Sequence, residues 1–345
     1  MTSNEHMPRP VIVTGASGFV GSHVLRAVVA SGRTVVATDL STDPPEHALV
    51  GLETSHLTYI PGDITATTTL DALAKATDGT TDVIHVAALI QMAQLGSSLG
   101  ESAPTPAAAL RSLEVNAMAS WRLCTSLVEA NRLGRFVHVS TRSVFGGRPS
   151  TRSNIDEQAP PQPAGVYGAS KAAAEHGLLA LRAQFDVDLV IARITGVFGP
   201  WQGPVSWIGQ AMDAAIAGRP YRAATGGDDA YELTYVKDTV RGIMMLLDAQ
   251  HLASDVYHVA SGARLTKLSE VEIALRQADP AADVSFGDGT HEAARGRSVL
   301  GTTVIRNELG FVPTWSLDAA IADYLAIERS GDYGPEADND RRVAG

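Results

Sequence analysis

Several features are scarce or missing in this chain of 345 residues. It has a single cysteine, Cys124, which excludes an internal disulfide framework. Cys124 lies in a stretch with helical apolar spacing, SWRLCTSLVEA, so we expect a buried thiol. No apolar run approaches the roughly 18 residues that a membrane span needs, and the first ten residues lack the basic and apolar regions of a signal peptide. We therefore expect a cytoplasmic protein that does not bind a membrane.

Positive charge and metal-ligand patterns are scarce as well. The formal net charge is −11, and only four of the 27 basic residues are Lys. A surface that binds duplex nucleic acid needs clustered Lys and Arg, so we expect no nucleic-acid partner. The ten His residues include no HExxH pair and no Cys/His cluster, so we expect no metal. The remaining composition is that of an ordinary globular protein, with a length that suits a large α/β domain and an appendage.

Short apolar, β-branched runs alternate with Ala- and Leu-rich helical patterns through the first 200 residues. The predicted strands are Val11–Thr14, Thr34–Thr38, Leu57–Ile60, Val83–Val86, Phe136–Val139 and Leu189–Arg193. The predicted helices begin near Gly18, Thr67, Pro106 and Ala164. Continuous apolar strands that alternate with helices predict a doubly wound parallel sheet, the α/β Rossmann fold, with its ligand at the carboxyl ends of the strands.

The pattern loosens after Gly199, at the turn-rich stretch GPWQGPV. We expect residues 1–199 to form the dinucleotide-binding domain with the catalytic residues, and residues 200–327 to form mainly a smaller substrate-binding lobe. Residues 328–345 lack apolar periodicity and are predicted to be a disordered tail. The Gly-, Ser- and Pro-rich segment 94–106 follows a predicted strand, where a ligand would lie.

The stretch TGASGFVG follows the first predicted strand and opens a helix. Gly15 permits the tight turn, Gly18 lets backbone N–H groups approach a pyrophosphate, and Gly21 allows close packing of helix and strand. The start of the helix adds unpaired donors and the positive end of its dipole. A tight turn without a ligand is the alternative for this motif alone. Asp39 ends the second strand, where a carboxylate accepts from ribose hydroxyls and repels the 2′-phosphate of NADP, so motif and acid together predict NAD.

The stretch VYGASK places Tyr167 and Lys171 four residues apart, on one face of a helix. Removal of a hydride from an alcohol needs a base that accepts the hydroxyl proton. Free tyrosine, with a pKa of ~10, is protonated near neutral pH and so is not a good base there. A nearby cation lowers this pKa, and Lys171 can supply it and also bond the nicotinamide ribose. Ser140, Thr141 and Ser143 end the fifth strand and can polarise the substrate oxygen. A structural aromatic–lysine contact and solvated strand-end hydroxyls are the alternatives.

These motifs resemble, in order along residues 10–327, the extended short-chain dehydrogenase/reductases of the NAD-dependent epimerase/dehydratase family. Further matching segments are GDI (62–64), HVAAL (85–89), VNAMAS (115–120), ARITGVFGP (192–200), YELTYVKD (231–238), YHVASG (257–262) and NELGFVPTWSLDAAI (307–321). The resemblance implies a catalytic triad of Thr141, Tyr167 and Lys171, with Ser143 as a helper. It also implies cofactor contacts from Gly15, Gly18, Phe19, Val20, Gly21, Asp39, Asp63, Ile64, Ala87, Ala88, Leu89, Asn116, Tyr167 and Lys171.

The chain departs from the family pattern beside the triad. The family's dehydratases carry Asp-Glu directly after the catalytic Thr, whereas this chain has Arg142 and Ser143, which disfavours sugar 4,6-dehydration. Nucleotide-sugar members usually have Asn at the position of Gly196 and Arg at the position of Tyr231. The missing Arg removes a charge-assisted contact to a substrate diphosphate. We expect these four positions to contact the substrate.

Other basic residues offer a replacement for that contact. Arg142, Arg193 and Arg222 lie in the same motifs or near them, although a purely structural role is the alternative for Arg193. The loop 91–106 exceeds the usual family length by about ten residues, and it follows the turn beside the cofactor. We therefore expect it to reshape the substrate pocket.

The leading hypothesis is an NAD-dependent dehydrogenase that transfers a hydride between NAD and a secondary alcohol of a sugar-like or polyhydroxylated small molecule. A sugar or nucleotide-sugar epimerase that retains its NAD would use the same triad and stays open. A non-catalytic dinucleotide-binding sensor is a third alternative. The resemblance also implies a homodimer, formed by the helix that ends near Glu129 and the helix that bears Tyr167.

Overall fold

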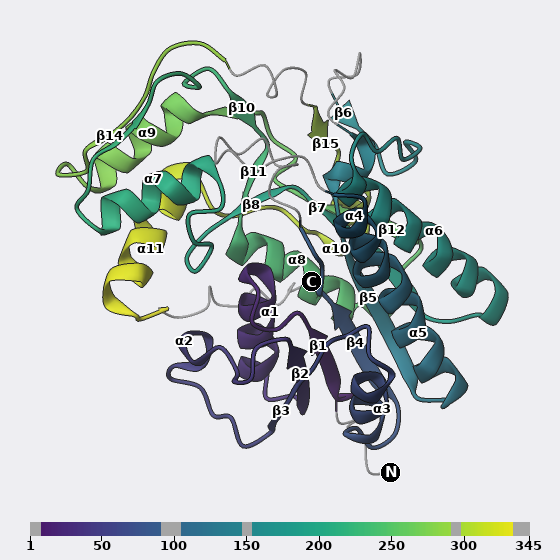
Figure 1. Ribbon diagram of the computed structural model, residues 1–345. Helices are drawn as coiled ribbons and strands as arrows, with labels where there is room; N and C mark the ends of the chain where they lie inside the picture. Colours follow the sequence, from purple (N-terminus) through teal and green to yellow (C-terminus); the bar gives the residue numbers. More distant parts are fainter. Residues whose placement is uncertain (1–7, 91–104, 147–153, 291–297, 334–345) are drawn as a thin grey trace, which may run out of the picture.

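A seven-stranded parallel sheet forms the centre of the computed structural model, which describes residues 8–90, 105–146, 154–290 and 298–333 (Figure 1). Its strands are β1 (Val11–Thr14), β2 (Val35–Asp39), β3 (Leu57–Pro61), β4 (Thr81–His85), β5 (Leu133–Thr141), β7 (Leu189–Ile194) and β12 (Val256–Val259). They lie in the order β12-β7-β5-β4-β1-β2-β3. The direction of winding reverses between β1 and β4, and such a switch opens a ligand crevice at the carboxyl ends of the strands.

All six predicted strands belong to this sheet, which confirms the doubly wound α/β fold. β1 has the predicted bounds, while β2 and β4 are displaced by one or two residues. β5 is longer than predicted at both ends, because its pairing with β4 and β7 continues beyond the apolar run. Its extension to Thr141 places that hydroxyl at the crevice edge.

Helices cover both faces of the sheet. They are α1 (Phe19–Ala30), α2 (Glu46–Leu49), α3 (Thr67–Lys75), α4 (Pro106–Leu113), the π-helical turn η2 (Glu114–Met118), α5 (Ala119–Glu129), α6 (Val166–Phe185), α8 (Val236–Asp248) and α10 (Thr303–Leu309). Along β1, Val11 and Val13 pack with α1 and α8, whereas Ile12 packs with α3, α5 and α6 on the other face. Cys124 is fully buried in this second cluster, as predicted. Among the described helices, none has the length and apolar character to cross a membrane.

A second lobe lies away from the sheet, at the upper left of Figure 1. It contains α7 (Trp207–Ile216), α9 (Leu268–Ala278), α11 (Leu317–Ser330), β9 (Tyr221–Ala223), β10 (Ala230–Tyr231), β13 (Thr266–Lys267) and β14 (Val284–Phe286). Four short strands and a 3₁₀ turn lie in the site region. They are β6 (Asn154–Ile155), β8 (Gly196–Phe198), β11 (Leu233–Tyr235), β15 (Val299–Leu300) and the turn η3 (Arg142–Phe145). Residues 200–327 are predicted to lie mainly in the second lobe, but α8 and β12 return to the central sheet, where β12 pairs with β7.

The predicted disordered tail begins too early. α11 continues to Ser330, and Tyr333 is only 7% exposed. The Tyr333 hydroxyl is 2.7 Å from His23 Nδ1, and its ring stacks on Trp201. An aromatic side chain in a polar segment therefore anchors the chain to α1, which composition alone does not reveal. Residues 334–345 and most of the 91–106 loop lie outside the described residues.

Candidate active site

The glycine turn after β1 packs against the end of β4. Gly15 has a φ of +71°, and a Cβ there would lie 2.6 Å from the backbone nitrogen of Ala87. A Cβ on Gly21 would lie 1.7 Å from the Gly15 carbonyl oxygen, so α1 approaches the turn as closely as glycine allows. α1 begins after Gly18 without a side-chain cap. Its first backbone N–H groups therefore remain available for an anion at the carboxyl edge of the sheet.

The Asp39 carboxylate lies at the same edge, beside this turn. It accepts from the backbone N–H of Ser17 at 2.9 Å and from that of Leu40 at 2.7 Å. The Tyr59 hydroxyl is 3.0 Å from Ser17 Oγ, and it donates to the Ser41 carbonyl at 3.0 Å. The sequence prediction missed Tyr59, which comes from β3 and has no motif to mark it. These contacts hold the Asp39 carboxylate in place at the end of β2.

Thr141 and Tyr167 meet because α6 packs closely on the η3 turn. A Cβ on Gly168 would lie 2.3 Å from the Ser143 carbonyl oxygen, so only glycine lets the helix come this near. Thr141 Oγ1 accepts from the Ser143 backbone N–H at 3.2 Å and lies 3.3 Å from Ser143 Oγ. The Tyr167 side chain forms a hydrogen bond with Thr141. The structure thus brings together the three hydroxyl groups predicted for catalysis.

Lys171 lies one helical turn further along α6 and is 1% exposed. Its Nζ has no hydrogen-bond partner within the described part of the chain. Burial lowers the pKa of Lys171 to about 7, against an opposing effect of Glu175. Burial also raises the pKa of Tyr167 to about 12, against the hydrogen bond with Thr141. The expected lowering of the tyrosine pKa by Lys171 is therefore not seen in the protein alone, where burial dominates both groups.

Asn116 connects the elements around the crevice. It lies on the π-helical turn η2 and is fully buried. Its Oδ1 accepts from the Leu89 N–H at 2.7 Å, and its Nδ2 donates to the Leu89 carbonyl at 3.0 Å and to Ser170 Oγ at 2.9 Å. Both amide hydrogens are thus used within the protein. The geometry makes Asn116 a brace between the end of β4 and α6.

The other predicted cofactor residues surround the same edge. Phe19 and Val20 open α1, Ala88 follows β4, and Ile64 is 8% exposed beneath the β3 end. The Asp63 carboxylate is already engaged, because it accepts from Thr65 and forms an ion pair with Arg111 at 2.5 Å.

Two of the predicted substrate residues, Arg142 and Gly196, lie near Glu232, a buried carboxylate that the sequence prediction left without a role. Glu232 accepts from the backbone N–H groups of Gly262 and Leu300, and burial raises its pKa to about 7, against the effects of these bonds and of Arg142. Arg142 donates to the Ser298 carbonyl at 2.9 Å. A Cβ on Gly196 would lie 2.9 Å from the Glu232 carbonyl oxygen, so the family's usual Asn does not fit this backbone.

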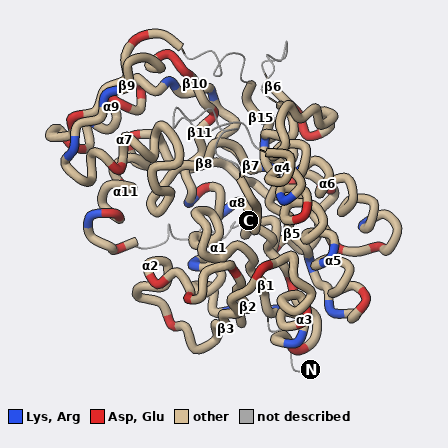
Figure 2. The backbone as a smooth tube through the Cα atoms, viewed as in Figure 1, with Lys and Arg blue, Asp and Glu red and all other residues tan. Residues whose placement is uncertain are grey.

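The remaining members of this set differ in placement. Tyr231 lies on β10, paired with Thr266 of β13 in the second lobe. Arg193 is buried in an ion pair with Glu175, which confirms the structural alternative for this residue. Arg193 is therefore not free to replace the missing diphosphate contact. Arg222 forms an exposed ion pair with Asp283 on the second lobe, where Figure 2 shows basic and acidic positions interspersed along the chain.

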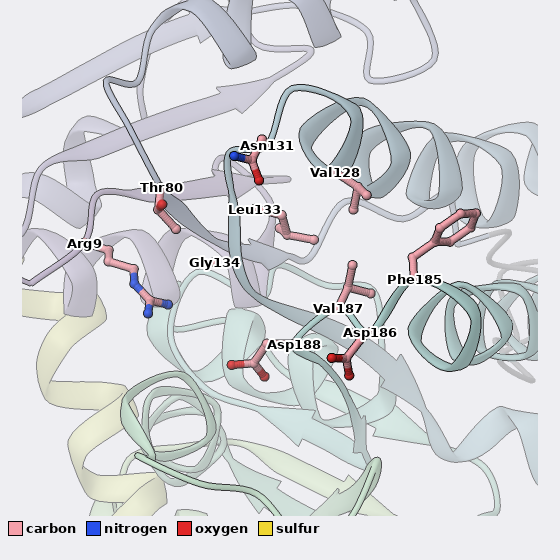
Figure 3. Close-up of a pocket in the computed structure, with 10 residues that line it drawn as sticks. All are labelled: Arg9, Thr80, Val128, Asn131, Leu133, Gly134, Phe185, Asp186, Val187 and Asp188. Carbon is pink, nitrogen blue, oxygen red and sulfur yellow. The ribbon is translucent and has the colours of Figure 1, made fainter.

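A hollow of about 360 Å³ lies at the opposite edge of the sheet (Figure 3). It is lined by Arg9, Thr80, Val128, Asn131, Leu133, Gly134, Phe185, Asp186, Val187 and Asp188. Leu133 begins β5 and Asp188 precedes β7, so this hollow faces the amino ends of the strands. It is separate from the chemical groups described above.

The carboxyl edge has the features of a dinucleotide site in a Rossmann-type enzyme. A glycine turn and a helix start can receive a pyrophosphate, and a carboxylate at the end of β2 can receive a ribose. The buried Lys171 ammonium lacks a partner within the described residues, and a ligand hydroxyl would satisfy it. The residues present therefore fit such a cofactor.

Comparison with known proteins identifies the family. Residues 11–260 match the model of the NAD dependent epimerase/dehydratase family, so the chain belongs to this family and uses NAD. A dTDP-glucose 4,6-dehydratase of Streptomyces niveus is 29% identical over 311 residues, 88% of each chain. A Bacillus subtilis (strain 168) protein named as an uncharacterized UDP-glucose epimerase, YtcB, is 26% identical over 81% of this chain and 85% of its own. The structure of MoeE5 in complex with UDP-glucose and NAD is 26% identical, with a TM-score of 0.74 over 93% of this chain and 99% of its own.

Proposed function

We propose that this protein oxidises a secondary alcohol of a sugar-like substrate at the Thr141–Tyr167–Lys171 cluster, as an NAD-dependent dehydrogenase. The observation that carries the proposal is the meeting of these side chains at the carboxyl edge, beside the glycine turn. The family assignment supports NAD as the cofactor at that edge. The sensor alternative has no supporting observation, because both the tyrosine and the lysine are present.

Each group of the cluster has a distinct task in this proposal. Tyr167 takes the hydroxyl proton from the substrate, and Thr141 donates a hydrogen bond to the same oxygen. When bound at this edge, NAD would supply the hydride acceptor and a positive charge. Lys171 in its charged form favours the phenolate and bonds the cofactor ribose. Because burial raises the pKa of Tyr167 to about 12, a positive charge beside it favours its action as a base.

The cofactor is held by four sets of groups in this proposal. The Gly15–Gly21 turn receives the pyrophosphate, and Asp39 receives the adenosine ribose, with Tyr59 supporting the turn. Asp63 and Ile64 border the adenine, and residues 87–89 border the nicotinamide side. Asn116 acts by holding Leu89 and Ser170 in place.

Sugar nucleotides are the first substrates to test, because the relatives and the MoeE5 complex carry names of this chemistry. In this proposal the second lobe and the loop 91–106 supply substrate contacts. Arg142, Ser143, Gly196 and Tyr231 are the residues proposed to contact the substrate. Dehydration remains disfavoured. At the two positions after Thr141, the chain has a guanidinium and a hydroxyl in place of the acid and base that water elimination needs.

An epimerase that keeps its NAD is the second candidate, favoured by the similarity to the Bacillus subtilis protein. Denaturing freshly purified protein and measuring released NAD and NADH separates the two. Near-stoichiometric cofactor supports the epimerase, whereas a cofactor-free protein that binds NAD reversibly supports the dehydrogenase. A sugar-nucleotide panel is then followed by NADH absorbance and by isomer exchange. If the protein does not bind NAD and turns over no sugar nucleotide of the panel, the proposed function is refuted.

A homodimer and a cytoplasmic location complete the proposal. Exposed apolar side chains support the dimer: Leu110 and Leu113 on α4, Met118 on η2 and Phe185 at the end of α6. They flank the two helices expected at the interface. Light scattering should give twice the chain mass of 36.2 kDa. A monomer at micromolar concentration would remove the dimer from the proposal.

A further inference from the structure

A charged residue, Glu175, continues the catalytic face of α6 beyond Tyr167 and Lys171. Glu175 follows Lys171 by four residues, as Lys171 follows Tyr167, so the three share one side of the helix. Glu175 is 1% exposed. Its carboxylate accepts from Arg193 Nε at 3.1 and 3.2 Å, from Arg193 Nη2 at 2.8 Å and from Ser140 Oγ at 2.5 Å. A buried carboxylate is thus fixed in one position by donors from two neighbouring strands.

Among the described residues, Glu175 is the one carboxylate that shifts the pKa of Lys171. Lys171 is faced by Tyr167 and Glu175 from α6 itself, and by His85 on β4 and His138 on β5 from the sheet. Burial and the nearby Lys171 lower the pKa of both histidines, so they carry no charge near neutral pH. Glu175 raises the pKa of Lys171 against the larger effect of burial, although the two side chains form no direct ion pair in the described structure.

The same carboxylate is connected to the strand that carries Thr141. Ser140 directly precedes Thr141 at the end of β5, and its hydroxyl is bound to Glu175. Arg193 extends the connection, because its guanidinium lies 4.9 Å from the centre of the Phe145 ring, which ends the η3 turn. Glu175 on α6 is therefore joined to the end of β5, and these two elements bear all three members of the triad.

We propose that Glu175, clamped by Arg193 and Ser140, is a positioning residue that keeps Lys171 protonated beside Tyr167 and fixes the end of β5. The physical reason is the low dielectric of the site. Burial disfavours an ammonium group, and a fixed negative charge nearby offsets that cost far more strongly than it would in water. The inference rests on the proposed function in that Lys171 is taken as a member of the triad.

The test is a direct titration of Lys171 in the free protein. Glu175→Gln keeps the size of the side chain and an acceptor oxygen for Ser140, but removes the charge. With only four Lys in the chain, protein labelled with ¹³C-lysine gives few ε-carbon signals, and Lys171→Met identifies the one of interest. We expect the Lys171 inflection of Glu175→Gln to lie about one pH unit below that of the wild type. Ser140→Ala is the matched control, because it removes a hydrogen bond to Glu175 and keeps the charge, so the inflection should shift less.

A second variant covers the case in which Glu175→Gln leaves Arg193 unpaired and the protein does not fold. Glu175→Gln with Arg193→Met removes both charges, a replacement that buried ion pairs often tolerate. The Lys171 inflection should again fall, since Arg193 is not among the groups that shift Lys171. An unmoved or raised inflection overturns the proposal. The titration uses neither NAD nor substrate, so missing NAD binding or turnover would count against the proposed function and not against this inference.

Discussion

The two edges of the central sheet each bury a charged group, and these two groups differ in how they are satisfied. At the edge formed by the amino ends of the strands, the Asp82 carboxylate accepts from Arg33 at 2.8 Å, from Arg9 at 3.2 Å and from a backbone N–H at 2.8 Å. At the carboxyl edge, the Lys171 ammonium is buried without a hydrogen-bond partner in the described chain. Burying an unpaired polar group is costly, so the second arrangement is expected where a ligand completes it.

This difference between the two edges indicates which of them holds the active site. The hollow in Figure 3 lies at the amino edge, where Arg9 and Asp188 already have protein partners. The unsatisfied group and the strongly shifted pKa values of Tyr167 and Lys171 lie at the other edge. Chemistry therefore locates the site better than the shape of the surface does.

The largest expected effect comes from Tyr167→Phe at the carboxyl edge. Loss of the proton acceptor should lower kcat by about 10²–10⁴-fold, the range for general acid–base catalysis. NAD affinity, measured by titration calorimetry, should change little. Tyr257→Phe is the matched control, because Tyr257 lies on β12 and its hydroxyl contacts Glu308. Undiminished turnover in Tyr167→Phe would refute the assigned base.

Asp82→Ala should destabilise the fold at the amino edge of the sheet. It removes the buried acceptor of one Arg33 guanidinium nitrogen and of the Arg135 backbone N–H, so the free energy of unfolding in urea should fall by about 3–5 kcal/mol. The NAD dissociation constant of the folded protein should stay the same, since the sheet separates the two edges. Asp283→Ala removes an exposed ion pair with Arg222 and should cost only about 0–1 kcal/mol. Equal losses of unfolding free energy in Asp82→Ala and Asp283→Ala would contradict the expected difference between a buried and an exposed acceptor.

Asp39→Asn should change the choice of cofactor. The amide keeps an acceptor for the Ser17 N–H but loses the charge that binds the ribose and repels a 2′-phosphate. The preference for NAD over NADP, measured as the ratio of dissociation constants, should fall by about 10–100-fold. Asp43→Asn removes an exposed charge that contacts Thr42 and should leave the ratio unchanged. If the ratio is the same in both variants, Asp39 does not select the cofactor.

Lys171→Met should reveal the unpaired amine through the pH dependence of stability. Burial lowers the pKa of Lys171 from its ordinary 10.5 to about 7, so the unfolded chain binds the extra proton between these pH values. The wild type should therefore gain stability relative to the variant as the pH rises from about 7 to about 10, and the variant should be more stable at pH 7 by at least about 1 kcal/mol. Other shifted groups, such as Glu232, cancel in this difference.

The control for this measurement is Lys75→Met, at an exposed position on α3. Its unfolding free energy should follow that of the wild type at every pH. A Lys171→Met curve parallel to that of Lys75→Met would show that the amine is satisfied in the folded protein.

Local patterns predicted the sheet and much of the candidate site. The glycine turn and the Tyr167–Lys171 pair are visible in the sequence because each depends on spacings of a few residues within one element. Tyr59, Glu175 and Glu232 were missed as members of the site. Their contacts join different elements: Tyr59 reaches Ser17 across 42 positions, and Glu232 reaches Leu300 across 68. The periodicity of apolar residues within one element does not predict contacts between distant elements.

The sequence by itself determined the parallel sheet, the family and the chemical groups needed for hydride transfer, because strand composition, turn glycines and helical spacing are properties of neighbouring residues. Tertiary structure decided which of these groups stay unsatisfied. It paired Arg193 with Glu175, buried Lys171 beneath the crevice and returned α8 and β12 to the sheet. Burial and long-range pairing set the charge of a side chain, and both depend on the whole fold.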